Sequence, residues 1–329
     1  MATQFITRFD MRAPGASNAE RQELFSRAVE QATYVDAHGQ DAIMLSEHHG
    51  SPDGYLPSPL LLASAIAART QRIPISVSAL IVNLYQPRRL AEDIAVLDLI
   101  SAGRVSYVLA LGYRPVEYAM FDRDWESRGL DIENAIGEML DAWAGTDFTA
   151  AGETTRVTPP PFSRPHPFLY YGGSSPAAAR RAARLGLNFA PQLADRALKQ
   201  LYLEECERLG RQPGHVLIPP TGPATVFCST DPDRFWANHG EHLLADARGY
   251  DAWHGDMESH VRDRSTTVRQ LRAAGSYLVA TPDELIERCR SGELRLITSH
   301  PLCGNMPAEP SWENQQLLCE KVIPALREG

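Results

Sequence analysis

The sequence predicts an α/β protein in which eight buried strands alternate with helices, as in a closed (β/α)8 barrel. Short apolar runs rich in β-branched residues recur along the chain, and stretches with helical periodicity separate them. An open, doubly wound sheet alternates similarly but usually carries a glycine-rich first turn, and neither GxGxxG nor GxxxxGK[ST] occurs here. Because no repeat and no convincing linker is present, we expect one barrel domain over residues 1–329.

The first part of the chain is expected to form four strands, each followed by helical sequence. The strands are predicted at 3–9, 41–46, 73–82 and 104–109, and the helices at 18–38, 57–70, 88–100, 115–121 and 127–144. The first helix is typical: Leu24, Ala28, Ala32 and Val35 follow helical spacing, and Gly39 ends it.

The second part continues the alternation. Strands are predicted at 168–171, at 187–190, within 215–228 and at 294–299, and helices at 176–185, 195–209, 232–248, 282–290 and 311–326. Two stretches interrupt the pattern: 145–167 is polar and rich in turn residues, and 249–276 is irregular or helical. We interpret them as insertions after strands four and seven of one barrel.

Composition excludes several classes of function. A net charge of −9 and a pI near 5.6 argue against a nucleic-acid partner or an anionic membrane surface. The five cysteines form no CxxC pair, which is typical of reduced thiols in a cytoplasmic protein rather than of a disulfide framework or a zinc site. We expect no signal peptide and no membrane span, because the N-terminus lacks the signal pattern and no apolar run approaches about 20 residues.

A polar cluster, Glu47-His48-His49, directly follows the apolar run Ala42 to Leu45. Ionisable groups at the carboxyl end of a buried strand are costly to place, and in a (β/α)8 barrel that end carries the chemistry. Histidine titrates near neutrality, so a general acid or base is the favoured interpretation. Adjacent strand residues point to opposite sides, which disfavours a shared metal, and no HExxH is present. The structural alternative is one histidine that caps the strand and one that is solvated.

A second motif, Tyr170 to Pro176, joins a strand to an alanine-rich helix through Gly172-Gly173-Ser174-Ser175. Glycines let a ligand approach the backbone, and the start of a helix favours negative charge, so the motif predicts a phosphate site. The alternative is an ordinary helix cap at Ser175.

A third segment, Gly112 to Tyr118, follows the fourth predicted strand and delivers Tyr113 and Arg114 to the mouth of a barrel. These side chains could hold an anion or a ring. Alternatively, Arg114 simply pairs with Glu117 in a turn.

Together, in this order, these motifs resemble the bacterial luciferase-like monooxygenase superfamily, and the resemblance covers nearly the whole chain. The matching pieces are 46–49, 86–93, 98–104, 111–118 and 172–183, and the tail 300–304 is similar to the end of the eighth strand in one branch. The resemblance implies a (β/α)8 barrel that binds reduced flavin mononucleotide (FMN) or, in some branches, the deazaflavin coenzyme F-420. Flavin-type members activate O2 as a flavin C4a-(hydro)peroxide and oxygenate an organic substrate. The Glu-His-His sequence favours the flavin branch.

The resemblance also implies roles for individual residues. His48 would handle the proton or the peroxide, with support from Glu47 and His49. The cofactor-binding residues would be Ser78, Ala79, Tyr113, Arg114, Gly172, Gly173, Ser174 and Ser175, with the phosphate on the two serines and a non-prolyl cis peptide at Ser78–Ala79. Tyr55, Tyr85 and His300 would line the substrate pocket, and no metal is expected.

The chain departs from the luciferase pattern at two informative positions. Leu111 stands where the luciferase α-subunit has a phosphate-binding arginine, so Arg114 or backbone groups must take that role. Ala110 replaces a cysteine near the flavin, so light emission is not expected.

The implied partners are O2, a small organic substrate and a separate NAD(P)H:flavin reductase, because no nicotinamide fingerprint occurs. A homodimer is expected from the family. Three alternatives stay open: a deazaflavin-dependent hydride transferase, a flavin-binding protein without catalysis, and, more distantly, a metal-dependent hydrolase.

Overall fold

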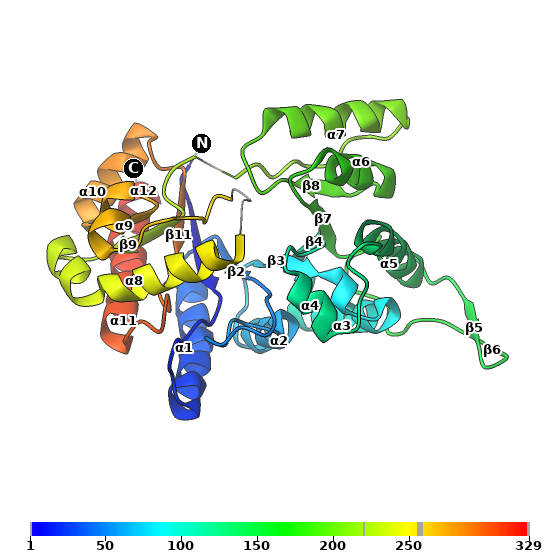
Figure 1. The fold of residues 1–329 in the computed structure, drawn as a ribbon, viewed down its shortest axis with the longest axis horizontal. Coiled ribbons are helices and arrows are strands. Elements are labelled where there is room, and N and C mark those ends of the chain that lie inside the picture. Colours follow the sequence, from blue (N-terminus) through cyan, green and yellow to red (C-terminus); the bar gives the residue numbers. More distant parts are fainter. Residues whose placement is uncertain (1, 220, 255–258, 328–329) are drawn as a thin grey trace. The chain divides into compact units, whose positions relative to one another are not determined.

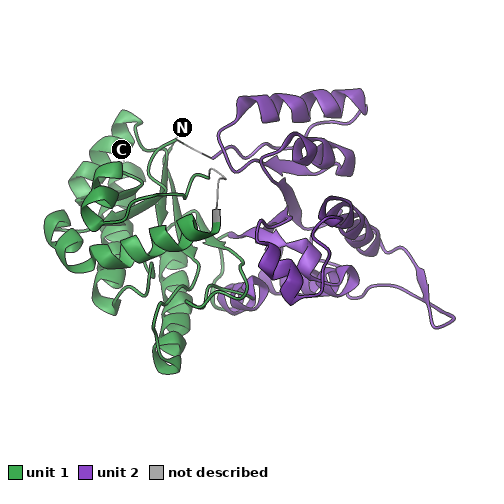
Figure 2. Ribbon diagram, in the orientation of Figure 1, with its two compact units in different colours: residues 1–57, 69–74, 220–329 green, residues 58–68, 75–219 purple. Residues whose placement is uncertain are grey.

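The computed structural model describes residues 2–219, 221–254 and 259–327. The chain divides into two compact units (Figure 2). Unit 1 comprises residues 1–57, 69–74 and 220–329, and unit 2 comprises residues 58–68 and 75–219. The expectation of one domain over the whole chain stays a prediction.

Unit 1 contains two sets of parallel strands. Strand β1 (Gln4–Phe9) pairs with both β2 (Ala42–Leu45) and β11 (Leu296–Ser299), and β9 (Thr225–Cys228) pairs with β10 (Tyr277–Ala280). Its helices are α1 (Asn18–Ala37), α8 (Pro232–His254), α9 (Val268–Ala274), α10 (Pro282–Ser291), α11 (Ala308–Leu317) and α12 (Ile323–Arg327) (Figure 1). Helices α1 and α10 each begin with a capping box, Ser17 with Glu20 and Thr281 with Glu284.

The core of unit 1 includes a cluster between α8 and the pair β9–β10. Phe227 and Tyr277 come from the strands, and Trp236 and Leu243 come from the helix. The apolar face of α8 is therefore buried, which fixes the direction in which this helix leaves the strands.

Unit 2 is a parallel ladder in the order β3 (Ile75–Ile81), β4 (Val105–Ala110), β7 (Phe168–Gly172) and β8 (Asn188–Ala190). The helices are α2 (Pro59–Arg69, whose last residue belongs to unit 1), α3 (Pro87–Ser101), α4 (Pro115–Met120), α5 (Arg128–Trp143), α6 (Pro176–Leu185) and α7 (Arg196–Arg208). An antiparallel hairpin, β5 (Phe148–Ala150) with β6 (Glu153–Thr155), extends away from the rest of the unit (Figure 1).

The eight predicted strands are all present, with ends that move by one or two residues and with the broadly placed seventh strand narrowed to β9. The structure adds three strands that were not predicted: β10, and the strands β5 and β6 of the hairpin in the turn-rich stretch 145–167. The apolar run of β10 was not identified because it directly follows the stretch interpreted as an insertion. The structure also corrects the end of one helix: α8 continues to His254, beyond the predicted end at 248. Helix α9 lies in the stretch interpreted as irregular or helical, in agreement with that interpretation.

None of the helices in the described part of the chain is both long enough and apolar enough to cross a membrane.

Candidate functional site

The polar cluster predicted at the end of β2 is buried in unit 1. Glu47, His48 and His49 are each less than a tenth exposed. Nε2 of His49 lies 2.9 Å from Oε1 of Glu47, and the backbone N–H of His48 donates to the carbonyl of Leu56 at 3.1 Å. The carboxylate therefore holds the His49 ring, while the His48 backbone is fixed by the loop that follows the cluster.

Aromatic rings surround the side chain of His48. The ring centroids of Tyr55 and Trp253 both lie 4.8 Å from that of His48. The Tyr55 hydroxyl lies 2.9 Å from the Tyr250 hydroxyl, which donates to Oδ2 of Asp10 at 3.2 Å. Burial raises the pKa of both tyrosines well above the ordinary value, so they remain protonated donors at neutral pH.

A second polar cluster lies at the ends of the paired strands β1 and β11 and includes His300, which directly follows β11. Nη2 of Arg8 lies 3.0 Å from Nδ1 of His300, and Nε2 of His300 lies 3.1 Å from Oδ1 of Asp10. Because a guanidinium only donates, Nδ1 accepts and Nε2 carries the proton that faces Asp10. His300, predicted in the substrate pocket, is thus fully buried between an arginine and a carboxylate.

Asp246 on α8 completes this cluster. Its Oδ2 accepts from the Tyr277 hydroxyl at 2.6 Å and lies 3.5 Å from Nη2 of Arg8. Burial works to raise the pKa of Asp10, but His300 and Arg8 lower it, and the net result is a pKa well below the usual range. Burial lowers the pKa of Arg8, but the neighbouring acidic groups raise it well above its ordinary value, so Arg8 and Asp10 both carry their charges at neutral pH.

Among the described residues, Asp246, His300 and Cys303 form one group with ligand atoms close enough to hold a metal, all within 4.8 Å of one another. The Arg8 guanidinium, however, already contacts both Asp246 and His300 and supplies the positive charge. Burial raises the pKa of the Cys303 thiol well above its ordinary value, which disfavours the thiolate that a metal requires. The arrangement favours a polar cluster over a metal centre.

The predicted phosphate loop lies in unit 2, between β7 and α6. A Cβ at Gly172 would lie only 2.7 Å from Cγ1 of Val108, and Gly173 adopts a φ of +143°. Oγ of Ser175 accepts from the Ala178 N–H at 3.2 Å and caps α6, and Oγ of Ser174 accepts from the Gln192 N–H at 2.9 Å. Both serines are exposed at the start of the helix, where the helix dipole favours an anion. The cap and the phosphate interpretations are thus compatible.

The peptide bond predicted to be cis, Ser78–Ala79, is cis in the structure. Ala79 packs against an apolar cluster of Val108, Tyr170 and Ala190 in the same unit. One side of this bond therefore packs against an apolar cluster that contains an aromatic ring.

The remaining predicted residues of unit 2 are engaged within the protein. Nη1 of Arg114 pairs with Oε1 of Glu117 at 2.9 Å, as the structural alternative expected. Tyr85 packs against Ile81, Leu84 and Tyr118. Tyr113 is partly buried beside Arg114.

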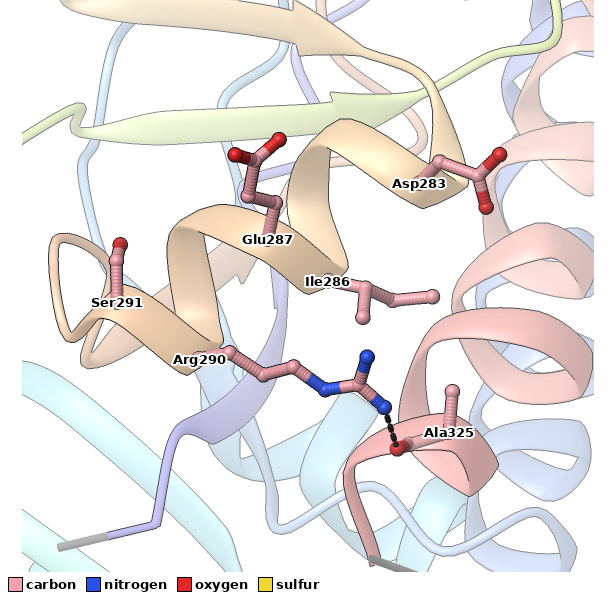
Figure 3. Close-up of a pocket in the computed structure, with 6 residues that line it drawn as sticks. All are labelled: Asp283, Ile286, Glu287, Arg290, Ser291 and Ala325. Atoms are coloured by element: carbon pink, nitrogen blue, oxygen red, sulfur yellow. Dashed lines mark hydrogen bonds between the residues drawn. The ribbon is translucent and has the colours of Figure 1, made fainter.

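A surface hollow of about 450 Å³ lies elsewhere in unit 1, between α10 and α12 (Figure 3). Arg290 spans it and donates to the carbonyl of Ala325 at 3.0 Å. Its described lining contains none of the residues predicted for the functional site, so the hollow plays no part in the candidate site.

Sequence reasoning did not identify Arg12, Asp246 or Tyr250 as parts of the site. Arg12 could have been found, because the sequence Arg8-Phe9-Asp10-Met11-Arg12 places charges at the end of an apolar strand, as 47–49 does. Asp246 and Tyr250 lie on a long helix and carry no local signal.

The sequence matches the family model described as luciferase-like monooxygenase over residues 4–299. The chain belongs to this family. Among curated relatives of this luciferase-like protein, the oxygenase component of a flavin-dependent trigonelline monooxygenase from Acinetobacter baylyi is 26% identical over 51% of this chain and 48% of its own length. An F420-dependent glucose-6-phosphate dehydrogenase from Nakamurella multipartita is 27% identical over 92% of this chain and 93% of its own. The chain spans about half the length of the first curated relatives that it matches.

Solved structures agree on the fold of the luciferase-like protein. The monooxygenase RslO1 from Streptomyces bottropensis has a TM-score of 0.74 at 22% identity, over 98% of this chain and 99% of the other. The oxygenating constituent of 3,6-diketocamphane monooxygenase from Pseudomonas putida, in complex with FMN, has a TM-score of 0.68 at 19% identity. The match covers 98% of this chain and 99% of the other. The predicted fold class, an α/β protein of the (β/α)8-barrel type, is confirmed.

Proposed function

We propose that this chain is the oxygenase component of a two-component monooxygenase that uses reduced FMN and O2 to oxygenate a small organic substrate. One observation carries the proposal: His48 is buried at the end of β2 and held in contact with the rings of Tyr55 and Trp253, in a chain of this family. A histidine in that position can exchange a proton in a place from which bulk water is excluded.

The loop of unit 2 suits the phosphate of FMN. Gly172 and Gly173 leave no side chain in the way, and Ser174 and Ser175 present hydroxyls at the start of α6. Because Glu117 engages Arg114, the hydroxyls and the backbone carry more of the phosphate binding than Arg114 and its neighbour Tyr113 do. The bond between Ser78 and Ala79, with the apolar cluster on one side, suits the flavin ring. Bound reduced FMN would supply the electrons for O2.

The residues of unit 1 would do the proton chemistry. His48 moves a proton, while Glu47 fixes the His49 ring beside it. Tyr55 contributes a protonated hydroxyl to the surroundings of His48. Tyr55, Tyr85 and His300 are the proposed substrate-pocket residues, with His300 acting through Asp10 and Arg8 because it is fully buried.

The test is anaerobic titration of the purified protein with reduced FMN and with reduced coenzyme F-420, followed by admission of oxygen. We expect selective binding of reduced FMN and a change in the flavin absorbance when oxygen enters. Binding of neither cofactor would overturn the proposal.

His48→Ala should abolish oxygenation of the substrate while leaving reduced FMN bound, because the proposed phosphate site lies in a different set of residues. His38→Ala is the matched control, since that histidine is exposed and stacks on Tyr34. Equal activity of the two variants would remove His48 from the mechanism.

A second candidate function is hydride transfer with F-420, which the full-length similarity to the Nakamurella enzyme supports. Selective binding of the deazaflavin would establish it, and binding of FMN without turnover of any substrate would favour a non-catalytic flavin protein. We further propose a separate NAD(P)H:flavin reductase as partner, a cytoplasmic location and a homodimer. The buried, reduced cysteines support the location.

A further inference from the structure

The residues that follow β1 place Arg12 inside an aromatic cage in unit 1. The guanidinium carbon lies 4.0 Å from the ring centroid of Trp253, 4.7 Å from that of Tyr250 and 5.1 Å from that of Tyr55. Only 1% of Arg12 is exposed. Stacking on aromatic faces is favourable for a guanidinium, but it satisfies none of the N–H donors in its plane.

Only part of the hydrogen-bonding capacity of Arg12 is used. Nη1 donates to Oδ2 of Asp53 at 2.8 Å. Nε and Nη2 have no hydrogen-bond partner among the residues that the structure describes. These two nitrogens share one edge of the guanidinium, the edge that binds a carboxylate with two parallel hydrogen bonds. Buried donors of a charged group are rarely left without an acceptor. We therefore expect a ligand to supply the acceptor for this edge.

The position of Arg12 is built into the surrounding chain. A Cβ at Gly249 on α8 would overlap Nη1 of Arg12, so glycine makes room for the guanidinium. The backbone N–H of Arg12 donates to Oδ1 of Asp10 at 3.1 Å, and its carbonyl accepts from the Asn305 N–H at 3.0 Å. The guanidinium is thus held before any ligand arrives, which lowers the entropy cost of binding.

The negative charges near Arg12 are already engaged. Asp53 accepts from Nη1, Asp10 accepts from Tyr250 and faces His300, and Asp246 accepts from Tyr277. None of the three fills the Nε–Nη2 edge.

We propose that the Nε–Nη2 edge of Arg12 binds the carboxylate of the organic substrate, which is therefore a small organic acid; this inference rests on the proposed function. Two rings of the cage, Tyr55 and Trp253, also contact the His48 ring. An acid bound to Arg12 would therefore extend its apolar or aromatic body along these rings, beside the histidine that handles the proton. Arg12 is then a specificity-determining residue, since a neutral primary amide presents one acceptor oxygen to the two donors, whereas a carboxylate presents two.

The test is calorimetric titration of the flavin-free, full-length protein near neutral pH with benzoate, phenylacetate and hexanoate, each compared with its own primary amide. We expect at least one acid to bind about tenfold or more tightly than its amide. This comparison needs no variant and does not depend on whether any substitution folds. If no acid is preferred over its amide, the proposal is wrong.

Variants then locate the preference. Arg12→Gln should remove it, and Arg12→Lys should keep only part of it, because lysine has the charge but not the planar donor edge. Arg21→Gln is the matched control, since Arg21 donates to backbone carbonyls of Ala13 and Asp53 in the same region and should keep the full preference. A preference that persists in a folded Arg12→Gln variant overturns the assignment to Arg12.

The result is separate from the test of the proposed function, because neither flavin nor oxygen is present. Acid binding without binding of reduced FMN would retain the carboxylate site and reject the monooxygenase. Binding of reduced FMN without any preference for acids would reject the carboxylate site and leave the proposed monooxygenase standing.

Discussion

The two units differ in the residues that lie at the ends of their strands. In unit 1, the ends of β1 and β2 carry charged and aromatic side chains that are buried and matched to one another, as in the contacts among Arg8, Asp10 and His300. In unit 2, the end of β7 carries Gly172 and Gly173 followed by exposed serines. One site depends on which side chains are present, and the other depends on side chains being absent.

This difference has an energetic basis. A buried ion is stable only while its partners remain, so removal of one partner leaves an uncompensated charge. A glycine loop holds no such charge, and its stability is sensitive to added volume instead. Substitutions that delete groups should therefore damage the buried cluster of unit 1, and substitutions that add a methyl group should damage the glycine loop of unit 2.

The largest effect is expected for Asp246→Ala. It removes the acceptor of the Tyr277 hydroxyl and a counter-charge of the buried Arg8, which should lower the free energy of unfolding by about 3–5 kcal/mol. Denaturant-induced unfolding measures the change. Asp233→Ala on the same helix is the control, since Asp233 pairs with Arg272 at the surface and its loss should cost about 1 kcal/mol or less. Equal losses in the two variants would show that Asp246 contributes no more to the free energy of unfolding than a surface ion pair does.

A smaller effect is expected for Gly172→Ala in unit 2. The new Cβ would meet Cγ1 of Val108 at 2.7 Å, and the strain should cost about 1–3 kcal/mol. Gly137→Ala in α5 adds the same methyl group where no atom lies within 4 Å, and it should stabilise the helix by up to about 1 kcal/mol. Thermal unfolding of the two variants should shift in opposite directions. A tolerated alanine at position 172 would contradict the close packing proposed for the phosphate loop.

The smallest expected effect is a change in how the free energy of unfolding depends on pH, and it comes from Asp10. Its pKa in the folded protein lies below the value of about 3.9 expected in the unfolded chain. The unfolded chain therefore binds the extra proton as the pH falls below that value, and the wild type loses stability there. As the pH falls, the free energy of unfolding of the wild type should decrease more steeply than that of the Asp10→Asn variant, by up to about 1.4 kcal/mol per pH unit. Parallel curves of unfolding free energy against pH for the two proteins would mean that Asp10 is not stabilised as a carboxylate.

The sequence predicted what depends on local pattern. The eight strands follow from their apolar runs, and Glu47 to His49 were identified because charges at the end of such a run are unusual. The contacts of Arg8 were out of reach, because its partners Asp246 and His300 lie 238 and 292 residues away along the chain. Trp253 reaches His48 from a helix whose predicted end was too early. The cis bond at Ser78–Ala79 came from family resemblance, since nothing in those two side chains demands it.

The contact between Gly249 and Arg12 has a consequence for evolution. A side chain at position 249 would overlap the guanidinium of Arg12, so the arginine would have to leave the position in which Asp53 and the three rings hold it. A lineage that loses the arginine is freed to accept alanine or serine at 249, whereas the reverse order of changes passes through a damaged intermediate. Among related sequences, we therefore expect larger residues at 249 to occur only where position 12 is no longer arginine. An alignment in which the two positions vary independently would contradict this expectation.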